Sequence, residues 1–484
     1  MTFSRTSRVA LALLGLAVVC VGLERCWLAF VEPLWFDEAW TAQVASTPDW
    51  STFWHEVYND IQAPLYYLAM RIWTPLAGAS NFALRLPALI ALAAAGVFPL
   101  VSHIKGLTRQ DRLTWGCLIF AWWGVGELLT ARGYGLLMAV STLQGVAFIQ
   151  LLETPNHGRA WRWCSLASCA ILLHYLCIVP VAAQGLTYVV SQRRKALRTW
   201  PALAAFAPAA AWMAYHAPRL AIFSGMAAWH PLVDGFGALE LIATAINPVS
   251  PWVAIGVGLI GIVALLRTRP PVEGDELGSD AHLWLAAGAS ALALALLLAL
   301  GAVRPILMAR YLIPVVPGML LGVVLCVRRS AYAKLLSFTL MTLYLGAALD
   351  PAPVMARVRQ AAPYGFETGS SYLMGHRVRR VVFIWDHPAA RFMDPASLRR
   401  VGEVFFKRAA YPVEITPLAP LETQDANRLA LAQAKADHSG VIWLYDRLSQ
   451  TSARRFPPRI HESDPRWTCQ RSGDDVIGAL ACYR

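Results

Sequence analysis

Two adjacent carboxylates, Asp37 and Glu38, follow the first apolar segment of the chain within the sequence EPLWFDEAWTAQVA. Three aromatic residues, Trp35, Phe36 and Trp40, lie beside them. A carboxylate that is partly removed from water binds a proton more strongly and becomes a useful general base. Asp37 could therefore take a proton from an acceptor hydroxyl. The structural alternative is that the pair lies in a solvated loop or caps a helix.

Two ionisable residues, Glu24 and Arg25, interrupt the outer half of the first predicted helix. Charged side chains at that depth in a membrane are costly, so they tend to line a cavity or contact a charged ligand. The competing explanation is that Glu24 and Arg25 pair with each other, or that Arg25 extends its guanidinium to the interface.

The composition of the whole chain predicts an integral membrane protein. Of its 484 residues, 57% are hydrophobic and 15% are charged, and the mean hydropathy is +0.46. A soluble domain could not cover so much apolar surface, so lipid must be the main solvent. The net charge of +12 does not indicate nucleic acid as a partner, because no basic stretch is interleaved with stacking aromatic residues.

The apolar segments and the basic clusters between them predict about eleven membrane crossings with a cytoplasmic N-terminus. We interpret the first segment as a retained helix, because no small-residue cleavage site of a signal peptide follows it. Residues 163–191 lie between two basic loops and so form two short helices that meet near His174. The remaining segments run approximately over residues 9–23, 81–104, 112–128, 134–152, 200–217, 248–266, 282–301, 306–327 and 331–349.

The chain is expected to divide into a transmembrane module, residues 1–349, and an extracytoplasmic α/β domain, residues 350–484. The first outer loop covers about residues 31–80. In the last part, the apolar runs VVFIW, VEITPL and GVIWLYD alternate with helix-like stretches such as PASLRRVGEVFFKRAA. A disulfide between Cys469 and Cys482 could form there if this part meets an oxidising compartment.

Several motifs follow one another along the first 350 residues. They are Arg25 in the first helix, PLWFDEA with Asp37 and Glu38, PLYY with Tyr66, NFALRLPALIAL, ELLTARGYGLLMA with Glu127, Arg132 and Tyr134, LLHYLCIVP with His174, and RPILMARYLIPVVPGMLL with Arg310 and Tyr311. Together these motifs resemble integral-membrane glycosyltransferases of the GT-C superfamily, near bacterial protein O-mannosyltransferases and the aminoarabinose transferases of lipid A. Relatives usually have Lys-Pro-Pro or His-Pro-Pro before Leu-Tyr-Tyr, whereas this chain has Gln62, Ala63 and Pro64.

This resemblance implies a GT-C fold and transfer of a sugar, with inversion, from a membrane-embedded polyprenyl phosphate to a glycan, lipid or protein acceptor outside the cytoplasm. Asp37 would be the base, with Glu38 or Glu127 orienting hydroxyls. Arginine and tyrosine donors at the interface would stabilise the phosphate leaving group. The residues expected to contact donor phosphate or sugar are Arg25, Gln62, Tyr66, Arg132, Tyr134, His174, Arg310 and Tyr311.

The expected partners are the donor, the acceptor and the membrane lipids of a bacterial plasma membrane. No cofactor is required by the sequence; some superfamily members depend on a divalent metal, and Asp37 and Glu127 could ligate one.

Two other functions stay open. A lipid-linked sugar transporter or flippase would also be polytopic, but it should show repeat symmetry and charged midplane helices. An envelope polysaccharide polymerase or ligase would use similar substrates, more often with paired arginines in outer loops.

Overall fold

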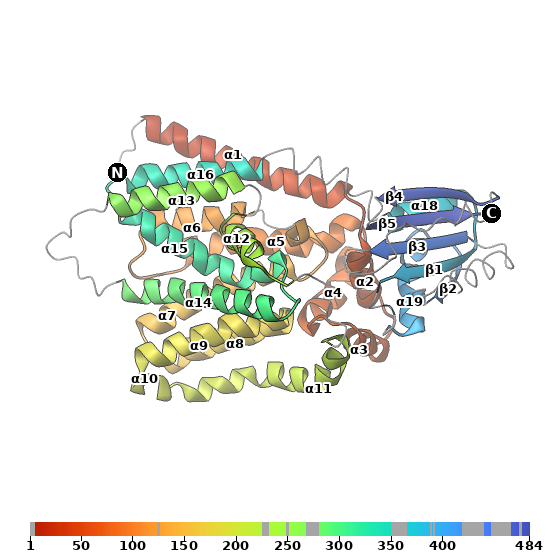
Figure 1. Cartoon of the computed structure of the whole chain (residues 1–484), viewed down its shortest axis with the longest axis horizontal. Coiled ribbons are helices and arrows are strands. Elements are labelled where there is room, and N and C mark those ends of the chain that lie inside the picture. The colour runs from red at the N-terminus through yellow and green to blue at the C-terminus, as the bar shows by residue number, and fades with distance from the viewer. Residues whose placement is uncertain are drawn as a thin grey trace. The chain divides into compact units, whose positions relative to one another are not determined.

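The computed structural model describes residues 5–122, 126–224, 232–247, 251–267, 280–349, 365–387, 390, 393–418, 440–446, 466–473 and 477–484 (Figure 1). The chain forms two compact units. Unit 1 comprises Met1–Ala29, Arg85–Tyr215 and Leu232–Asp350. Unit 2 comprises Phe30–Leu84, His216–Pro231 and Pro351–Arg484.

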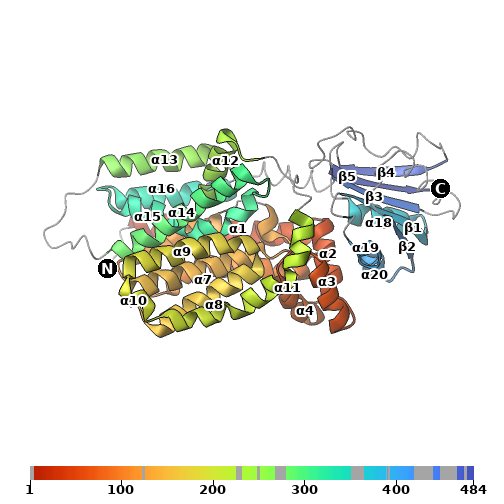
Figure 2. The ribbon, with the colours of Figure 1, turned by 60° about the horizontal axis from the view of Figure 1, so that its bottom comes forward.

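Unit 1 is helical throughout its described part. Helices α7, α8 and α9 lie side by side in both views (Figures 1 and 2). The helices that belong wholly or largely to this unit are α1 (Arg5–Val31), α5 (Asn81–Val101), α6 (Arg109–Ala121), α7 (Tyr134–Glu153), α8 (His157–Leu173), α9 (Ile178–Gln192), α10 (Arg194–Leu197), α12 (Gly235–Ile246), α13 (Pro251–Leu266), α14 (Ala281–Val303), α15 (Val316–Arg328) and α16 (Ala333–Ala348), with the 3-10 turns η1 (Gly126–Leu129), η2 (Tyr175–Cys177), η3 (Trp200–Phe206) and η4 (Ala309–Val315). Helix α11 (Ala207–Ser224) is divided between the two units.

Six helical segments among the described residues are long and apolar enough to cross a membrane. On α1, the side chains of Leu13, Leu16 and Leu23 are more than half exposed, as expected for a helix that faces lipid. Three shorter apolar helices accompany the six. The polytopic membrane architecture is therefore confirmed, while the count of about eleven crossings stays a prediction. The six segments are Ala12–Val31, Asn81–Val101, Tyr134–Glu153, Tyr175–Gln192, Ala281–Val303 and Ala309–Arg328.

Small residues and buried amides hold the helices of unit 1 together. A Cβ atom on Gly116 would clash with the carbonyl oxygen of Gly96, so α5 and α6 meet backbone to backbone. Gln144 Nε2 donates to Gln184 Oε1 at 2.6 Å, and Trp163 Nε1 donates to the same oxygen at 2.8 Å. Close backbone contact and interhelical hydrogen bonds are the usual stabilising features of helices packed in lipid.

The first loop of the chain folds into three helices, α2 (Phe36–Ala45), α3 (Trp50–Asn59) and α4 (Pro64–Ala77), all in unit 2. Local sequence sets their starts. The carboxylate of Asp49 accepts a hydrogen bond from Thr52 N at 2.7 Å and caps α3. Pro64 begins α4, where its missing N–H costs nothing.

The C-terminal part of unit 2 is the expected α/β fold. The sheet has the strand order β2-β1-β3-β5-β4. Strands β2 (Glu414–Leu418), β1 (Arg380–Asp386) and β3 (Gly440–Asp446) run parallel to one another. Strand β5 (Ile477–Tyr483) pairs antiparallel with β3, and β4 (Thr468–Gly473) pairs antiparallel with β5. Helices α18 (Phe366–Gly375), α19 (Pro395–Gly402) and α20 (Val404–Arg408) pack beside it (Figure 2). The three strands and the helical stretch predicted from sequence are thus present, and β4 and β5 were not anticipated. A Cys469–Cys482 disulfide joins β4 to β5.

By its contacts, the first loop belongs with the C-terminal residues rather than with the transmembrane helices. Nothing in the linear sequence indicated this grouping, because the two parts are more than 280 residues apart at their closest hydrogen bond, between Asn81 and Glu367. The division of the chain into domains 1–349 and 350–484 stays a prediction.

Candidate functional site

Four predicted side chains come together in unit 1. The imidazole of His174 has its centroid 4.6 Å from that of the Tyr311 ring and 6.3 Å from that of Tyr134. The guanidinium carbon of Arg310 lies 5.8 Å from the ring centroid of Tyr134 and 5.6 Å from that of Tyr311. We call Tyr134, His174, Arg310 and Tyr311 the arginine–aromatic cluster.

Helix ends position every member of the arginine–aromatic cluster. Tyr134 is the first residue of α7, and His174 follows the last residue of α8 in an extended conformation before the turn η2. Arg310 and Tyr311 lie in the turn η4, directly before α15. Backbone groups at helix ends are not committed to internal hydrogen bonds, so such positions suit ligand contact.

Positive charge in this cluster is carried by arginine and not by histidine. His174 lies in the turn between α8 and the span that begins at Tyr175. Burial, together with the charges of Arg310 and Arg132, lowers the pKa of His174 to about 3. His174 is therefore neutral at physiological pH, and its buried Nδ1 has no hydrogen-bond partner among the described residues. Two guanidinium groups beside a neutral imidazole and tyrosine rings suit an anionic ligand.

Arg25 also lies in unit 1, where its guanidinium contacts α6. Its Nη1 donates to the backbone oxygen of Phe120 at 2.6 Å, and its guanidinium carbon lies 4.8 Å from the centroid of the Phe120 ring. Only 2% of Arg25 is exposed. The guanidinium thus joins α1 to the end of α6. A contact from Arg25 to donor phosphate stays a prediction.

Glu127 belongs to the turn η1, and its side chain lies outside the described residues. Its predicted partner in a metal site, Asp37, belongs to unit 2. In the part of the chain that the structure describes, no group of three or more His, Cys, Asp or Glu residues could hold a metal ion. The divalent metal and the orienting role of Glu127 stay predictions.

Asp37 and Glu38 form the first turn of α2 and differ in environment. Glu38 is fully buried, and its Oε2 accepts a hydrogen bond from Trp35 N at 3.3 Å. Glu38 therefore caps the helix, as the structural alternative proposed. Asp37 is only half-buried, and its backbone oxygen accepts from the Thr41 hydroxyl at 3.1 Å. Of the two residues, Asp37 is the more exposed.

Gln62 and Tyr66 lie where α3 passes into α4. Tyr66 is buried in the first turn of α4, and Gln62 is half-buried two residues before that helix. The neighbouring Tyr67 hydroxyl donates to Asp60 Oδ2, which fixes the turn between the helices. The structure thus gives Gln62 a defined place beside the PLYY motif, although its contact with a donor is untested.

Two residues that the sequence analysis missed hold this turn. His216 Nε2 donates to the backbone oxygen of Tyr58 at 2.9 Å, and the Arg219 guanidinium donates to that of Asn59 at 2.9 and 3.2 Å. Both carbonyls belong to the last turn of α3. Carbonyl oxygens in the last turn of a helix have no N–H partner within the helix, and the negative end of the helix dipole attracts cations. The only signal in the sequence was the i, i+3 spacing of a histidine and an arginine late in an apolar segment.

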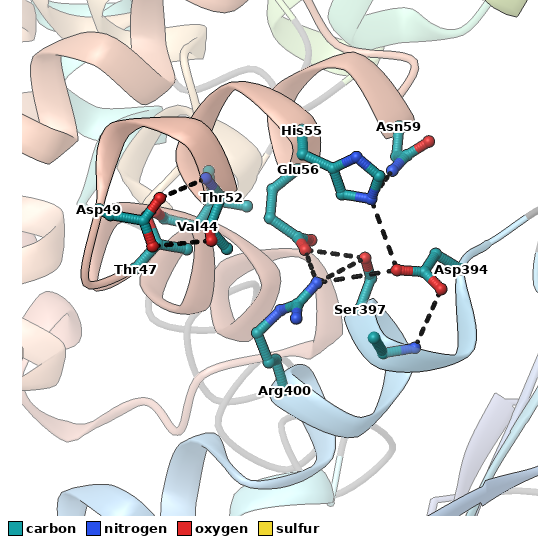
Figure 3. Close-up of polar contacts among 11 residues, drawn as sticks. Val44, Thr47, Asp49, Thr52, His55, Glu56, Asn59, Asp394, Ser397 and Arg400 are labelled. Atoms are coloured by element: carbon teal, nitrogen blue, oxygen red, sulfur yellow. Dashed lines mark hydrogen bonds and ion pairs between the residues drawn. The ribbon is translucent and has the colours of Figure 1, made fainter.

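A buried charge network connects α3 to α19 within unit 2 (Figure 3). Glu56 is fully buried, and its Oε1 accepts hydrogen bonds from Arg400 and, at 2.8 Å, from Ser397 Oγ. Asp394 Oδ2 lies 3.8 Å from Arg400 Nη2 and 3.5 Å from His55 Nε2. The ion pair between Glu56 and Arg400 therefore joins the first loop to the C-terminal α/β fold, and its carboxylate is shielded from water.

Removing Arg400 should destabilise unit 2. Arg400→Ala leaves the Glu56 carboxylate buried without its cation, which we expect to lower the free energy of unfolding by about 3 kcal/mol. Arg399→Ala is the matched control, because Arg399 is the exposed neighbour on the same helix. Denaturant unfolding of the purified variants measures the difference. Equal stabilities of the two variants would show that the pair carries no net stabilisation.

No family model matches the chain, and no curated protein matches it by sequence. Among solved structures, ArnT from Cupriavidus metallidurans in the apo state has a TM-score of 0.56 at 10% identity, covering 96% of this chain and 97% of that one. ArnT bound to undecaprenyl phosphate has a TM-score of 0.56 at 11% identity, with 99% and 98% covered. The chain has the fold of ArnT.

The likeness to ArnT confirms the fold that the motifs led us to expect. The likeness to ArnT covers nearly the whole length of both chains and includes the C-terminal sheet domain. At an identity of 10% it establishes the fold alone. The roles of the individual site residues stay predictions.

Proposed function

We propose that this protein is a membrane glycosyltransferase that moves a sugar from a polyprenyl-phosphate-linked donor to an acceptor on the extracytoplasmic face. The ArnT-like fold supports the class, and one ArnT structure contains undecaprenyl phosphate. The observation that carries the proposal is the arginine–aromatic cluster, in which Arg310 faces the rings of Tyr134 and Tyr311 beside a neutral His174.

The arginine–aromatic cluster and Arg132 would serve the donor phosphate. When the bond between the anomeric carbon and the phosphate oxygen breaks, the electron pair stays on the phosphate and its negative charge grows. Arg310 and Arg132 stabilise that charge, and the tyrosine hydroxyls of Tyr134 and Tyr311 can add hydrogen bonds. The neutral His174 can donate a hydrogen bond without adding a further charge.

Asp37 would act on the acceptor. Its carboxylate takes the proton of the acceptor hydroxyl as the oxygen attacks the anomeric carbon on the side opposite the phosphate, so the configuration inverts. The capping bond from Trp35 N to Glu38 fixes the first turn of α2, which limits the movement of Asp37. Glu127 would orient hydroxyl groups of the sugar or the acceptor.

The fold and the cysteines support a location for the reaction. The chain is an integral membrane protein, and we assign it to a bacterial plasma membrane with a cytoplasmic N-terminus. The Cys469–Cys482 disulfide supports an extracytoplasmic C-terminal domain, because disulfides persist in oxidising compartments.

Binding of a lipid phosphate tests the proposal independently of the sugar. We expect the purified protein in lipid nanodiscs to bind undecaprenyl phosphate about tenfold or more tightly than undecaprenol, because charge-assisted hydrogen bonds to the phosphate are lost with the alcohol. Titration of each lipid while following tryptophan fluorescence measures the two affinities. Equal affinities would remove the support for a phosphate site.

A further inference from the structure

The carboxylate of Glu367 on α18 connects the two ends of the first loop. Its Oε2 accepts a hydrogen bond from Leu34 N at 2.9 Å and another from Asn81 Nδ2 at 3.0 Å. Leu34 lies just before α2, and Asn81 is the first residue of α5. The carboxylate of Glu367, in the C-terminal α/β fold, therefore holds together the two ends of the first loop.

Further polar contacts fix this carboxylate and its partner. Arg408 Nη2 donates to Asn81 Oδ1 at 2.7 Å, and Arg408 Nη1 lies 3.8 Å from Glu367 Oε1. Asn81 Nδ2 also lies 3.3 Å from the backbone oxygen of Glu32. Glu367, Asn81 and Arg408 thus form a small network in which each side chain restrains the other two.

Aromatic packing joins the same two parts next to the candidate base. Phe36, the residue before Asp37, stacks on Trp385 at the end of β1 with ring centroids 4.4 Å apart. Its ring also lies 6.4 Å from that of Phe366, the neighbour of Glu367. Leu34 and Phe36, which lie three residues and one residue before Asp37, are therefore both held by the C-terminal α/β fold.

We infer that Glu367 is a positioning residue that sets the place of Asp37 through the backbone N–H of Leu34. This inference rests on the proposed function, in which Asp37 is the base. A hydrogen bond from a backbone N–H to a charged acceptor is strong and directional, so it fixes the chain just before α2. Small displacements of a catalytic group reduce the rate steeply, by about 100-fold for 1 Å.

The test compares Glu367→Ala, Glu367→Gln and Glu414→Ala. Glu414 lies on the edge strand β2 of the C-terminal α/β fold, where it pairs with the exposed Arg380, and serves as the control. We expect Glu367→Ala to lower kcat by about 10- to 100-fold with little change in the KM for the donor, since the arginines proposed to bind the donor phosphate, Arg132 and Arg310, belong to unit 1. Glu367→Gln, whose amide oxygen can still accept from Leu34 N–H, should recover most of the loss, and Glu414→Ala should resemble the wild type.

Hydrogen exchange supplies a measurement that does not depend on activity. Glu367→Ala should speed amide exchange at Leu34–Phe36, whereas Glu367→Gln and Glu414→Ala should not. Unchanged exchange in Glu367→Ala, or an equal loss of kcat in Glu367→Gln, would overturn the positioning role. If exchange changes as expected but the wild type transfers no sugar, the contact stands and the proposed function fails instead.

Discussion

Replacing Asp37 with Asn should reduce sugar transfer by about 10²- to 10⁴-fold, the usual contribution of a general base. The amide keeps the size of the side chain but cannot accept the proton of the acceptor hydroxyl. Asp37 is half-buried in the first turn of α2, and its neighbour Glu38 supplies the cap, so the helix should survive the substitution. Initial rates with a polyprenyl-phosphate-linked donor, at matched protein amounts, give the comparison.

Asp49→Asn is the matched control for this substitution. Asp49 caps the neighbouring helix α3 from an exposed position, and asparagine caps helices equally well. Its transfer rate should equal that of the wild type. A normal rate in Asp37→Asn would instead identify Asp37 as structural and leave the reaction without its base.

Replacing Arg310 with Ala should reduce transfer by about 10²- to 10³-fold, as expected for the loss of one donor to a developing negative charge. Arg310→Lys should fall between Arg310→Ala and the wild type, because lysine keeps the charge but loses the planar fork that binds two phosphate oxygens. The loss should appear in kcat/KM and be accompanied by weaker binding of undecaprenyl phosphate.

The control for Arg310 is Arg304→Ala, which removes an exposed arginine at the end of α14. Its binding of undecaprenyl phosphate should match that of the wild type. If Arg310→Ala binds the lipid and transfers sugar normally while Arg304→Ala does not, the phosphate lies elsewhere than at the arginine–aromatic cluster.

Much of the fold could be predicted from the sequence, because apolar segments and basic loops constrain a membrane protein strongly. The break at His174 followed from residues 163–191 lying between two basic loops, and the structure ends α8 there. The short helix α12 was missed because its 12 residues are fewer than a bilayer crossing needs. Strands β4 and β5 were missed because their residues lack a clear alternation of apolar and polar side chains.

The candidate site could be predicted in part. Tyr134, His174 and Arg310 are widely separated in sequence, yet each stands at a helix end, so one topology could place them together. The neutrality of His174 could not be predicted, because it depends on burial and on nearby arginines. The contacts of Glu367 with Leu34 and of Glu56 with Arg400 are long-range pairings that no local pattern encodes.

The most direct test of the central claim uses one donor labelled separately in its sugar and in its phosphate, added to membranes that contain the protein. A transferase should pass the sugar label to the acceptor and release the phosphate label as polyprenyl phosphate in equal amounts. A flippase or transporter would move both labels together on the intact donor. One-to-one separation of the two labels, lost in Asp37→Asn, is the predicted result; intact donor with both labels retained, across a panel of donor sugars, would contradict the account.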